Sequence, residues 1–229
     1  MQRARRLVSI PVIAAVGLLA LAGCRSEPGV AAYIGDTKIT EDRVTAIVDD
    51  ATTQLGENAE AQPPTRAMVV STLVLREVCD RLNPVPPAGQ PTPPPVSPEQ
   101  LSQNLGVPPT TTLAKESAEL QTCLMRIQAG PPIAPSAEQL ADVVTRGKAA
   151  GAIPPDFPAD QAAAQLDGEQ LRSALASRKA ISEAVDRYHV TVNPRYRPLE
   201  FPVLRFQGNV TAVGVPIGEA ASDAVIDRR

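Results

Sequence analysis

The chain is poor in the residues on which catalytic sites and large aromatic cores depend. Its 229 residues include no Trp, three Tyr, three Phe, three Cys and one His, His189. A single histidine without a nucleophile-elbow motif gives no catalytic triad, and three cysteines without zinc-type spacing give no metal site. There is also no glycine-rich loop of the kind that cradles phosphates. We therefore expect no enzyme, no metal and no cofactor, and a core built from Ala, Val, Leu and Ile, which helices accept easily.

Basic charge is scarce as well. The chain has 22 Lys and Arg against 25 Asp and Glu, and three of the arginines lie in residues 1–23, which contain no acid. The rest of the chain therefore carries 19 basic residues against 25 acidic ones, a net charge of −6. Binding to nucleic acid depends on clustered positive charge. Nucleic acid is consequently not an expected partner, and no small-molecule substrate is expected either.

The N-terminal residues have the pattern of an exported lipoprotein. Three arginines precede an uncharged apolar stretch over residues 7–22, which is typical of a secretory signal and short for a membrane span. The sequence Leu21-Ala22-Gly23-Cys24 resembles the bacterial lipobox, which implies cleavage after residue 23 and a diacylglyceryl group on Cys24. We predict a signal peptide over 1–23, a polar tether over 24–29, and a lipid anchor on the extracytoplasmic face of the cell membrane. The alternative is an ordinary signal peptide that ends at a cysteine by chance.

The other two cysteines, Cys79 and Cys123, are candidates for a disulfide. An even number of cysteines in an oxidising compartment favours a bridge. Closing a loop of this length would stabilise the fold by about 4 kcal/mol in the chain-entropy model. The alternative is two free, buried thiols.

Helical patterns fill most of the chain between residues 40 and 189. Apolar residues recur at helical spacing after a Thr40 N-cap, and capping-box patterns predict further helix starts at Ser97 and Ser136. The predicted helices cover about 41–55, 65–82, 97–106, 112–129, 136–151 and 158–188, and the alternative for the last is a restart at Asp167 and Gly168. The second of these is apolar over more than half of its circumference, so we expect it to be the central helix. The proline-rich segment 83–98 is predicted to be an exposed, extended loop.

Three short strands are predicted at the ends of this helical region, two before it and one after it. Residues 30–34 and 38–39 form a hairpin pattern around a Gly-Asp turn, and 190–192 alternate in polarity. Since a lone strand needs a partner, we expect the two ends to pair in a small sheet, which makes 30–196 the domain. Residues 197–229 have no usable period and are predicted to be a disordered tail. The alternative is a partner-contact segment, because two of the three Phe lie there.

The two ends of the domain resemble a known family. The run from Ala32 to Thr40, AYIGDTKIT, followed by a helix, resembles the opening of the SurA N-terminal domain. The run from Val190 to Tyr196, VTVNPRY, resembles the end of actinobacterial lipoproteins of that group. The resemblance implies a mostly helical SurA-N-like domain that binds unfolded or extended segments through an apolar groove between helices. It supplies no catalytic residues, and prolyl isomerase activity is not expected because the separate parvulin domain has no room here.

The expected function is that of a membrane-anchored chaperone or holdase. Its partners would be unfolded or nascent exported polypeptides, bound through apolar burial and backbone contacts. The alternative is an envelope interaction or scaffold lipoprotein with one specific protein partner and no catalysis. A contiguous apolar groove would favour client binding, whereas a uniformly polar surface would favour a scaffold.

Overall fold

Helices dominate the part of the chain that the computed structural model describes, residues 27–56, 63–82, 94–207 and 210–218. The helices in these ranges are α1 (Glu41–Leu55), α2 (Arg66–Leu82), α3 (Pro98–Leu105), α4 (Thr112–Leu124), α5 (Ala137–Ala149), α6 (Ala159–Leu166) and α7 (Glu169–Arg187). The expectation of a mostly helical fold is confirmed. None of the described helices is long and apolar enough to cross a membrane.

The helix boundaries follow local capping chemistry. The Thr40 hydroxyl accepts a hydrogen bond from the Arg43 N–H at the start of α1 (3.2 Å). At the start of α5, the Ser136 hydroxyl accepts from the Gln139 N–H (3.1 Å) and the Gln139 side chain accepts from the Ser136 N–H (2.9 Å). The prediction of a helix up to residue 129 was wrong for the last turn, because α4 ends at Leu124. Beyond it, the N–H groups of residues 126 and 127 bond three residues back, which continues the chain as tight turns.

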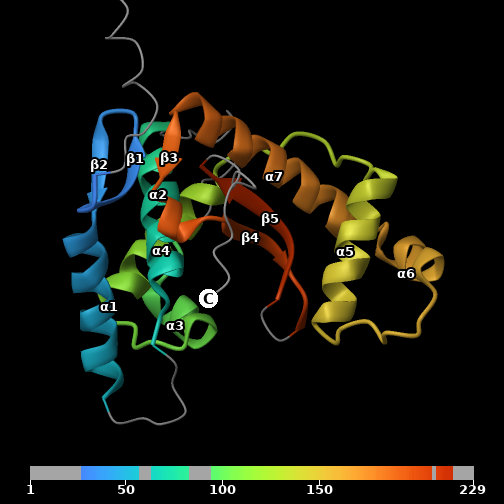
Figure 1. Ribbon diagram of the computed structural model, residues 1–229. Coiled ribbons are helices and arrows are strands. Elements are labelled where there is room, and N and C mark those ends of the chain that lie inside the picture. Colours follow the sequence, from blue (N-terminus) through green and yellow to red (C-terminus); the bar gives the residue numbers. More distant parts are fainter. Residues whose placement is uncertain (1–26, 57–62, 83–93, 208–209, 219–229) are drawn as a thin grey trace, which may run out of the picture.

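The two ends of the predicted domain pair in a three-stranded antiparallel sheet. The strands β1 (Val30–Ile34), β2 (Thr37–Thr40) and β3 (Val190–Val192) lie in the order β2-β1-β3. Ala32 lies opposite Val192, and the Asn193 side chain donates to the Val30 carbonyl (3.0 Å). Figure 1 shows the blue β1 and β2 beside the orange β3. The predicted pairing of the two ends of the domain is confirmed.

The prediction of a disordered tail from residue 197 was wrong for residues 197–207 and 210–218. The strands β4 (Leu199–Arg205) and β5 (Thr211–Ile217) form an antiparallel hairpin. Its residues Leu199, Val215 and Ile217 are at most 5% exposed and lie in the main core. Burial of this apolar surface is what orders the segment. The ordered domain therefore extends beyond residue 196, and residues 219–229 lie outside the described ranges.

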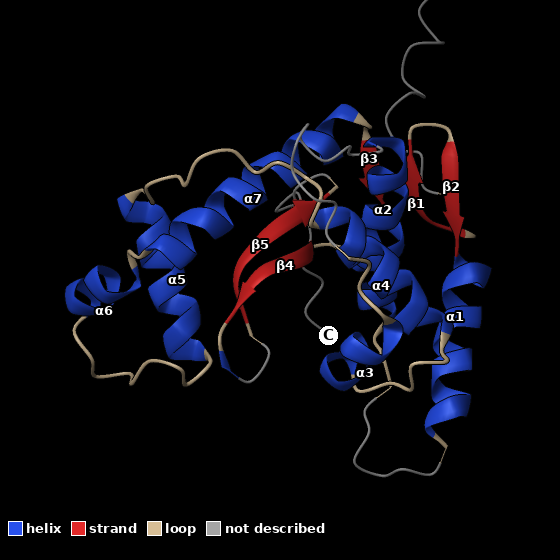
Figure 2. Ribbon diagram, turned by 180° about the vertical axis from the view of Figure 1, so that it is seen from behind, coloured by secondary structure: helices blue, strands red, loops and turns tan. Residues whose placement is uncertain are grey.

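The hairpin lies between two groups of helices. In Figure 1, α7 runs along the top and β4 and β5 lie beneath it, with α1 to α4 and the three-stranded sheet on one side and α5 and α6 on the other. Figure 2 shows the same arrangement from behind. The helix α2 has nine buried residues against seven in the longer α7, which confirms it as the central helix. A second apolar cluster joins α5 and α7 to β5.

Candidate binding groove

An open groove lies between α2, α3 and α4 on one side and β4 on the other. It has a volume of about 630 Å³. We call it the α2–β4 groove and define it by six of its lining residues: Met68, Ser71, Leu101, Ser117, Leu120 and Phe201. Over the whole lining, nine of the 18 residues are apolar and nine are polar, and the polar ones include Glu200 and Arg205. The groove exists only because elements that are far apart in the sequence meet there.

One buried polar group in this groove has no partner. Ser117 lies on α4 and is 9% exposed, and its hydroxyl finds no hydrogen-bond partner among the described residues. The neighbouring Ser71 hydroxyl, by contrast, donates to the Met68 carbonyl of its own helix (2.9 Å). A buried hydroxyl without a partner carries a free-energy cost. The hydroxyl oxygen has almost no accessible surface, so a ligand can bond to Ser117 and remove this cost only when the side chains around it shift, whereas the partly exposed Met68 is open to apolar groups of a ligand.

The edge of β4 limits how a ligand could bind. In the hairpin, Pro202 lies opposite Gly214, and Pro216 of β5 lies opposite Glu200. Proline has no N–H, so a strand added to the edge of β4 would lose a backbone hydrogen bond at Pro202. Recognition in the α2–β4 groove must therefore rest on side chains and isolated hydrogen bonds rather than on regular strand addition.

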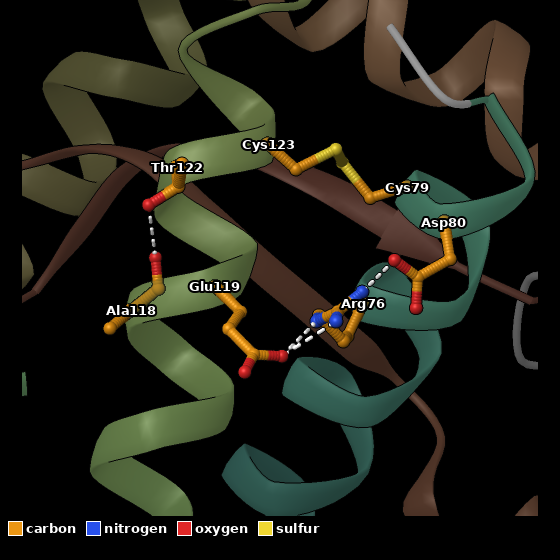
Figure 3. The surroundings of a disulfide bond; sticks show 7 residues. All are labelled: Arg76, Cys79, Asp80, Ala118, Glu119, Thr122 and Cys123. Carbon is orange, nitrogen blue, oxygen red and sulfur yellow. Dashed lines mark hydrogen bonds and ion pairs between the residues drawn. A yellow bond between two sulfur atoms is a disulfide. The ribbon is translucent and has the colours of Figure 1, made fainter. Parts of the chain in front are cut away.

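A disulfide joins the two helices that form one wall. Cys79 of α2 and Cys123 of α4 are bonded, with their Cα atoms 6.1 Å apart. Beside this bond, the Arg76 guanidinium of α2 donates from Nη2 to Glu119 Oε2 of α4 (2.6 Å). Figure 3 shows both links between the helices. The separation of α2 and α4 within this wall of the groove is thus fixed covalently.

A partly buried ionic cluster fixes the start of α2 to α1. Arg66 Nη2 lies 2.6 Å from Glu41 Oε2, and the Tyr196 hydroxyl donates to the same oxygen (2.7 Å). Burial by itself would raise the pKa of Glu41. Hydrogen bonds from Tyr196 and Arg66, together with the positive charges of Arg195 and Arg66, outweigh burial and hold this pKa below its ordinary value. Glu41 is therefore a charged anchor for α1, α2 and the 3₁₀ turn at Pro194–Tyr196.

The hairpin is attached to α5 by a second ion pair. Arg146 Nη1 on α5 donates to both carboxylate oxygens of Glu200 on β4 (2.9 and 3.1 Å). The Glu200 side chain passes over Gly214 of β5, where a β-carbon would overlap its Cγ, Cδ and Oε1 atoms. Glycine at position 214 is therefore needed for this pair, which holds β4 between the two groups of helices.

The residues singled out from the sequence fall in separate places. Cys24 lies outside the described residues. Cys79 and Cys123 come together in the disulfide. His189 is the second residue after α7, which ends at Arg187; it has φ 48°, and its N–H donates to the Asp186 carbonyl (3.1 Å). No cluster of His, Cys, Asp or Glu that could hold a metal ion is found within the described ranges.

Sequence reasoning missed the groove residues and the charged anchor. Nothing in the sequence marks Ser117 as unpartnered, because this depends on what packs around α4. Glu41 could be placed in the first turn of a helix from the sequence, but its partners Arg66 and Tyr196 lie 25 and 155 residues away.

No family model matches the chain, and neither a curated protein nor a solved structure matches it.

Proposed function

We propose that this protein is a lipid-anchored, extracytoplasmic chaperone or holdase that binds extended segments of unfolded or nascent exported polypeptides. The observation that carries the proposal is the α2–β4 groove, whose lining combines apolar side chains such as Met68 and Leu101 with polar ones, and the unpartnered hydroxyl of Ser117. The proposal agrees with what the resemblance to the SurA N-terminal domain implies. The lipid anchor rests on the lipobox pattern that ends at Cys24.

An extended polypeptide can supply both apolar side chains and hydrogen-bond acceptors to the groove. Its side chains can cover the partly exposed Met68, Leu101 and Phe201, and its backbone carbonyls can accept a hydrogen bond from Ser117 once the side chains around this hydroxyl shift. A groove of about 630 Å³ holds only a short stretch of chain. Since little area is buried and no regular strand is added, each binding event should be weak and tolerant of sequence. Weak, tolerant binding is what a holdase needs.

The anchor would keep the groove close to the membrane. Residues 24–29 form six links between the acylated Cys24 and Val30 of β1. Fully extended, they span about 20 Å. The domain would therefore meet exported chains as they leave the membrane.

A second candidate function is a scaffold lipoprotein with one specific partner. Within the described residues, the large apolar side chains that stand out as exposed are Met125 and Val210, at 42% and 37%. Neither lies in the α2–β4 groove. A surface with so little exposed apolar area suits one defined partner better than many clients.

The test is peptide binding and aggregation suppression by the acyl-free chain that begins at residue 25. We expect this chain to suppress aggregation of an unfolded model substrate and to bind unstructured peptides. Leu101→Ala, in the groove, should weaken peptide binding about tenfold, equivalent to about 1.4 kcal/mol. The matched control is Leu140→Ala, a half-buried leucine on α5 outside the groove, which should leave affinity unchanged.

Three outcomes separate the candidates. Suppression that depends on Leu101 favours the chaperone. No suppression at several-fold molar excess rejects it. One protein recovered in stoichiometric amount by crosslinking in the native envelope favours the scaffold.

A further inference from the structure

We propose that Cys123 is a site of thiol–disulfide exchange, at which a dithiol opens the bond to Cys79 while the protein stays folded. A dithiol carries two thiols on one molecule, of which the first attacks the bond and the second completes its reduction. The pocket at the disulfide shares no lining residue with the α2–β4 groove. The inference therefore goes beyond the proposed function and does not depend on it.

The disulfide lines a pocket between α2, α4 and the segment before α3. The pocket has a volume of about 260 Å³, and both Cys79 and Cys123 belong to its lining. Val96 forms part of the opposite side, and its N–H donates to the Thr122 hydroxyl of α4 (2.9 Å). A disulfide enclosed by a core has no space beside it, whereas this one has room for a small thiol.

The two bonded cysteines differ in their access to solvent. Cys79 of α2 is 1% exposed, whereas Cys123 of α4 is partly exposed. In thiol–disulfide exchange, access decides which sulfur an incoming thiolate attacks, and the other sulfur leaves. Attack should therefore fall on Cys123, with Cys79 as the leaving group.

Arg126 supplies a positive charge for this reaction. It lines the same pocket one turn after Cys123, and its N–H donates to the Cys123 carbonyl (2.9 Å). Its Nε finds no hydrogen-bond partner among the described residues. The Arg76 guanidinium, by contrast, is paired with Glu119 and Asp80, as Figure 3 shows. A nearby positive charge favours thiolate over thiol, so Arg126 can attract the incoming thiolate and stabilise the leaving one.

The exchange has two balanced steps. In the first, a thiolate of the dithiol forms a bond to Cys123 Sγ, the bond between Cys123 and Cys79 breaks, and its electron pair leaves on Cys79 Sγ, which takes up a proton. In the second, the other thiol of the reagent loses its proton, attacks the reagent sulfur that is bonded to Cys123, and expels the Cys123 thiolate. The dithiol is oxidised to a disulfide, and the protein gains two thiols.

The reaction would make the covalent link between α2 and α4 reversible. The ion pair of Arg76 with Glu119 does not depend on the disulfide, and both helices contribute to the main apolar core. The reduced protein should therefore keep its fold and become easier to unfold.

The first test is the rate at which dithiothreitol reduces the acyl-free chain from residue 25 in the absence of denaturant. Attack on the folded protein predicts a rate that rises in proportion to the dithiothreitol concentration. A rate that stays constant when the dithiol is in excess would overturn the proposal, because reduction would then wait for the chain to unfold. Absence of reduction would overturn it as well.

Single-cysteine variants identify the attacked sulfur. Cys79→Ala leaves Cys123 as a free thiol, and Cys123→Ala leaves Cys79. With an aromatic disulfide reagent, Cys123 should react at least about tenfold faster than Cys79. Equal rates in two variants that keep the circular dichroism of the natural chain would contradict the assignment. Where either variant fails to fold, the concentration dependence of the natural chain decides alone.

Substitution of Arg126 tests the role of its charge. Arg126→Gln should slow the reduction by dithiothreitol about threefold, and Arg126→Lys should restore most of the rate. The control is Arg187→Gln at the end of α7, which should leave the rate unchanged. An equal effect of Arg126→Gln and Arg187→Gln would contradict the role of Arg126.

The source of the dithiol can be identified in the same assay. A reduced protein with a Cys-X-X-Cys dithiol is compared with dithiothreitol at equal thiol concentration. Faster reduction by the protein supports exchange with a protein partner, and faster reduction by dithiothreitol supports exchange with a small dithiol. If neither reduces the folded chain, the exchange site is rejected.

Discussion

Replacing Cys79 and Cys123 together by alanine should lower the free energy of unfolding by about 4 kcal/mol. The bond closes a loop between residues 44 positions apart, and the chain-entropy model assigns about 4 kcal/mol to a loop of that length. Cys79 is 1% exposed, so removal of its sulfur adds a small packing loss. Domains of this kind are stable by about 5–15 kcal/mol in total. The loss is therefore a large share of the stability that holds α2 and α4 together.

The assay is guanidinium unfolding at neutral pH, followed by far-UV circular dichroism. The double variant should unfold at lower denaturant and with a larger slope, because its unfolded chain is no longer cross-linked and exposes more surface. Reductant should destabilise the natural chain by a similar amount and leave the variant unchanged. A loss below about 1 kcal/mol would refute the reasoning, since ordinary surface substitutions produce changes of that size. So would two free thiols in the denatured, unreduced natural chain.

Two further predictions concern the charged contacts. Glu41→Gln should cost about 1–2 kcal/mol at pH 7. Because the pKa of Glu41 is depressed in the folded chain, its contribution is complete above about pH 4.3 and is lost as the pH falls through the folded value. Unfolding of both chains at pH 7 and pH 3 should show the difference shrinking, and a constant difference would contradict the assignment. Gly214→Ala should cost about 1–3 kcal/mol by displacing Glu200 from Arg146. This cost should largely vanish in a Glu200→Ala background, and Gly168→Ala, where a β-carbon meets nothing within 4 Å, serves as the control.

Local signals were sufficient to predict the helices and the small sheet. The cap at Thr40 and the capping box at Ser136 identify helix starts because a side-chain oxygen next to an apolar period satisfies free N–H groups wherever it occurs. The pairing of β1 with β3 was predictable because a three-residue strand is not stable alone. The disulfide could be inferred only as one of two options, since the number of cysteines does not fix their distance.

The hairpin of β4 and β5 was not predicted because its strands do not alternate in polarity. Pro202 interrupts β4, and the register shifts between Pro202 and Arg205 move side chains from one face to the other. The signal that could have revealed it is the Gly208-Asn209 pair between two apolar runs, a dipeptide typical of hairpin turns. The α2–β4 groove could not be predicted without this hairpin, because β4 forms one of its walls.

The most direct test of the central claim is to ask where on the domain an unfolded polypeptide lies. A photo-crosslinking residue is placed at Leu101 in the groove of the acyl-free chain and, separately, at Leu140 on α5, and each protein is irradiated with the same unfolded substrate. The account predicts a crosslinked product from position 101 and none above background from position 140. Equal crosslinking at both positions, or crosslinking at position 140 alone, would contradict it.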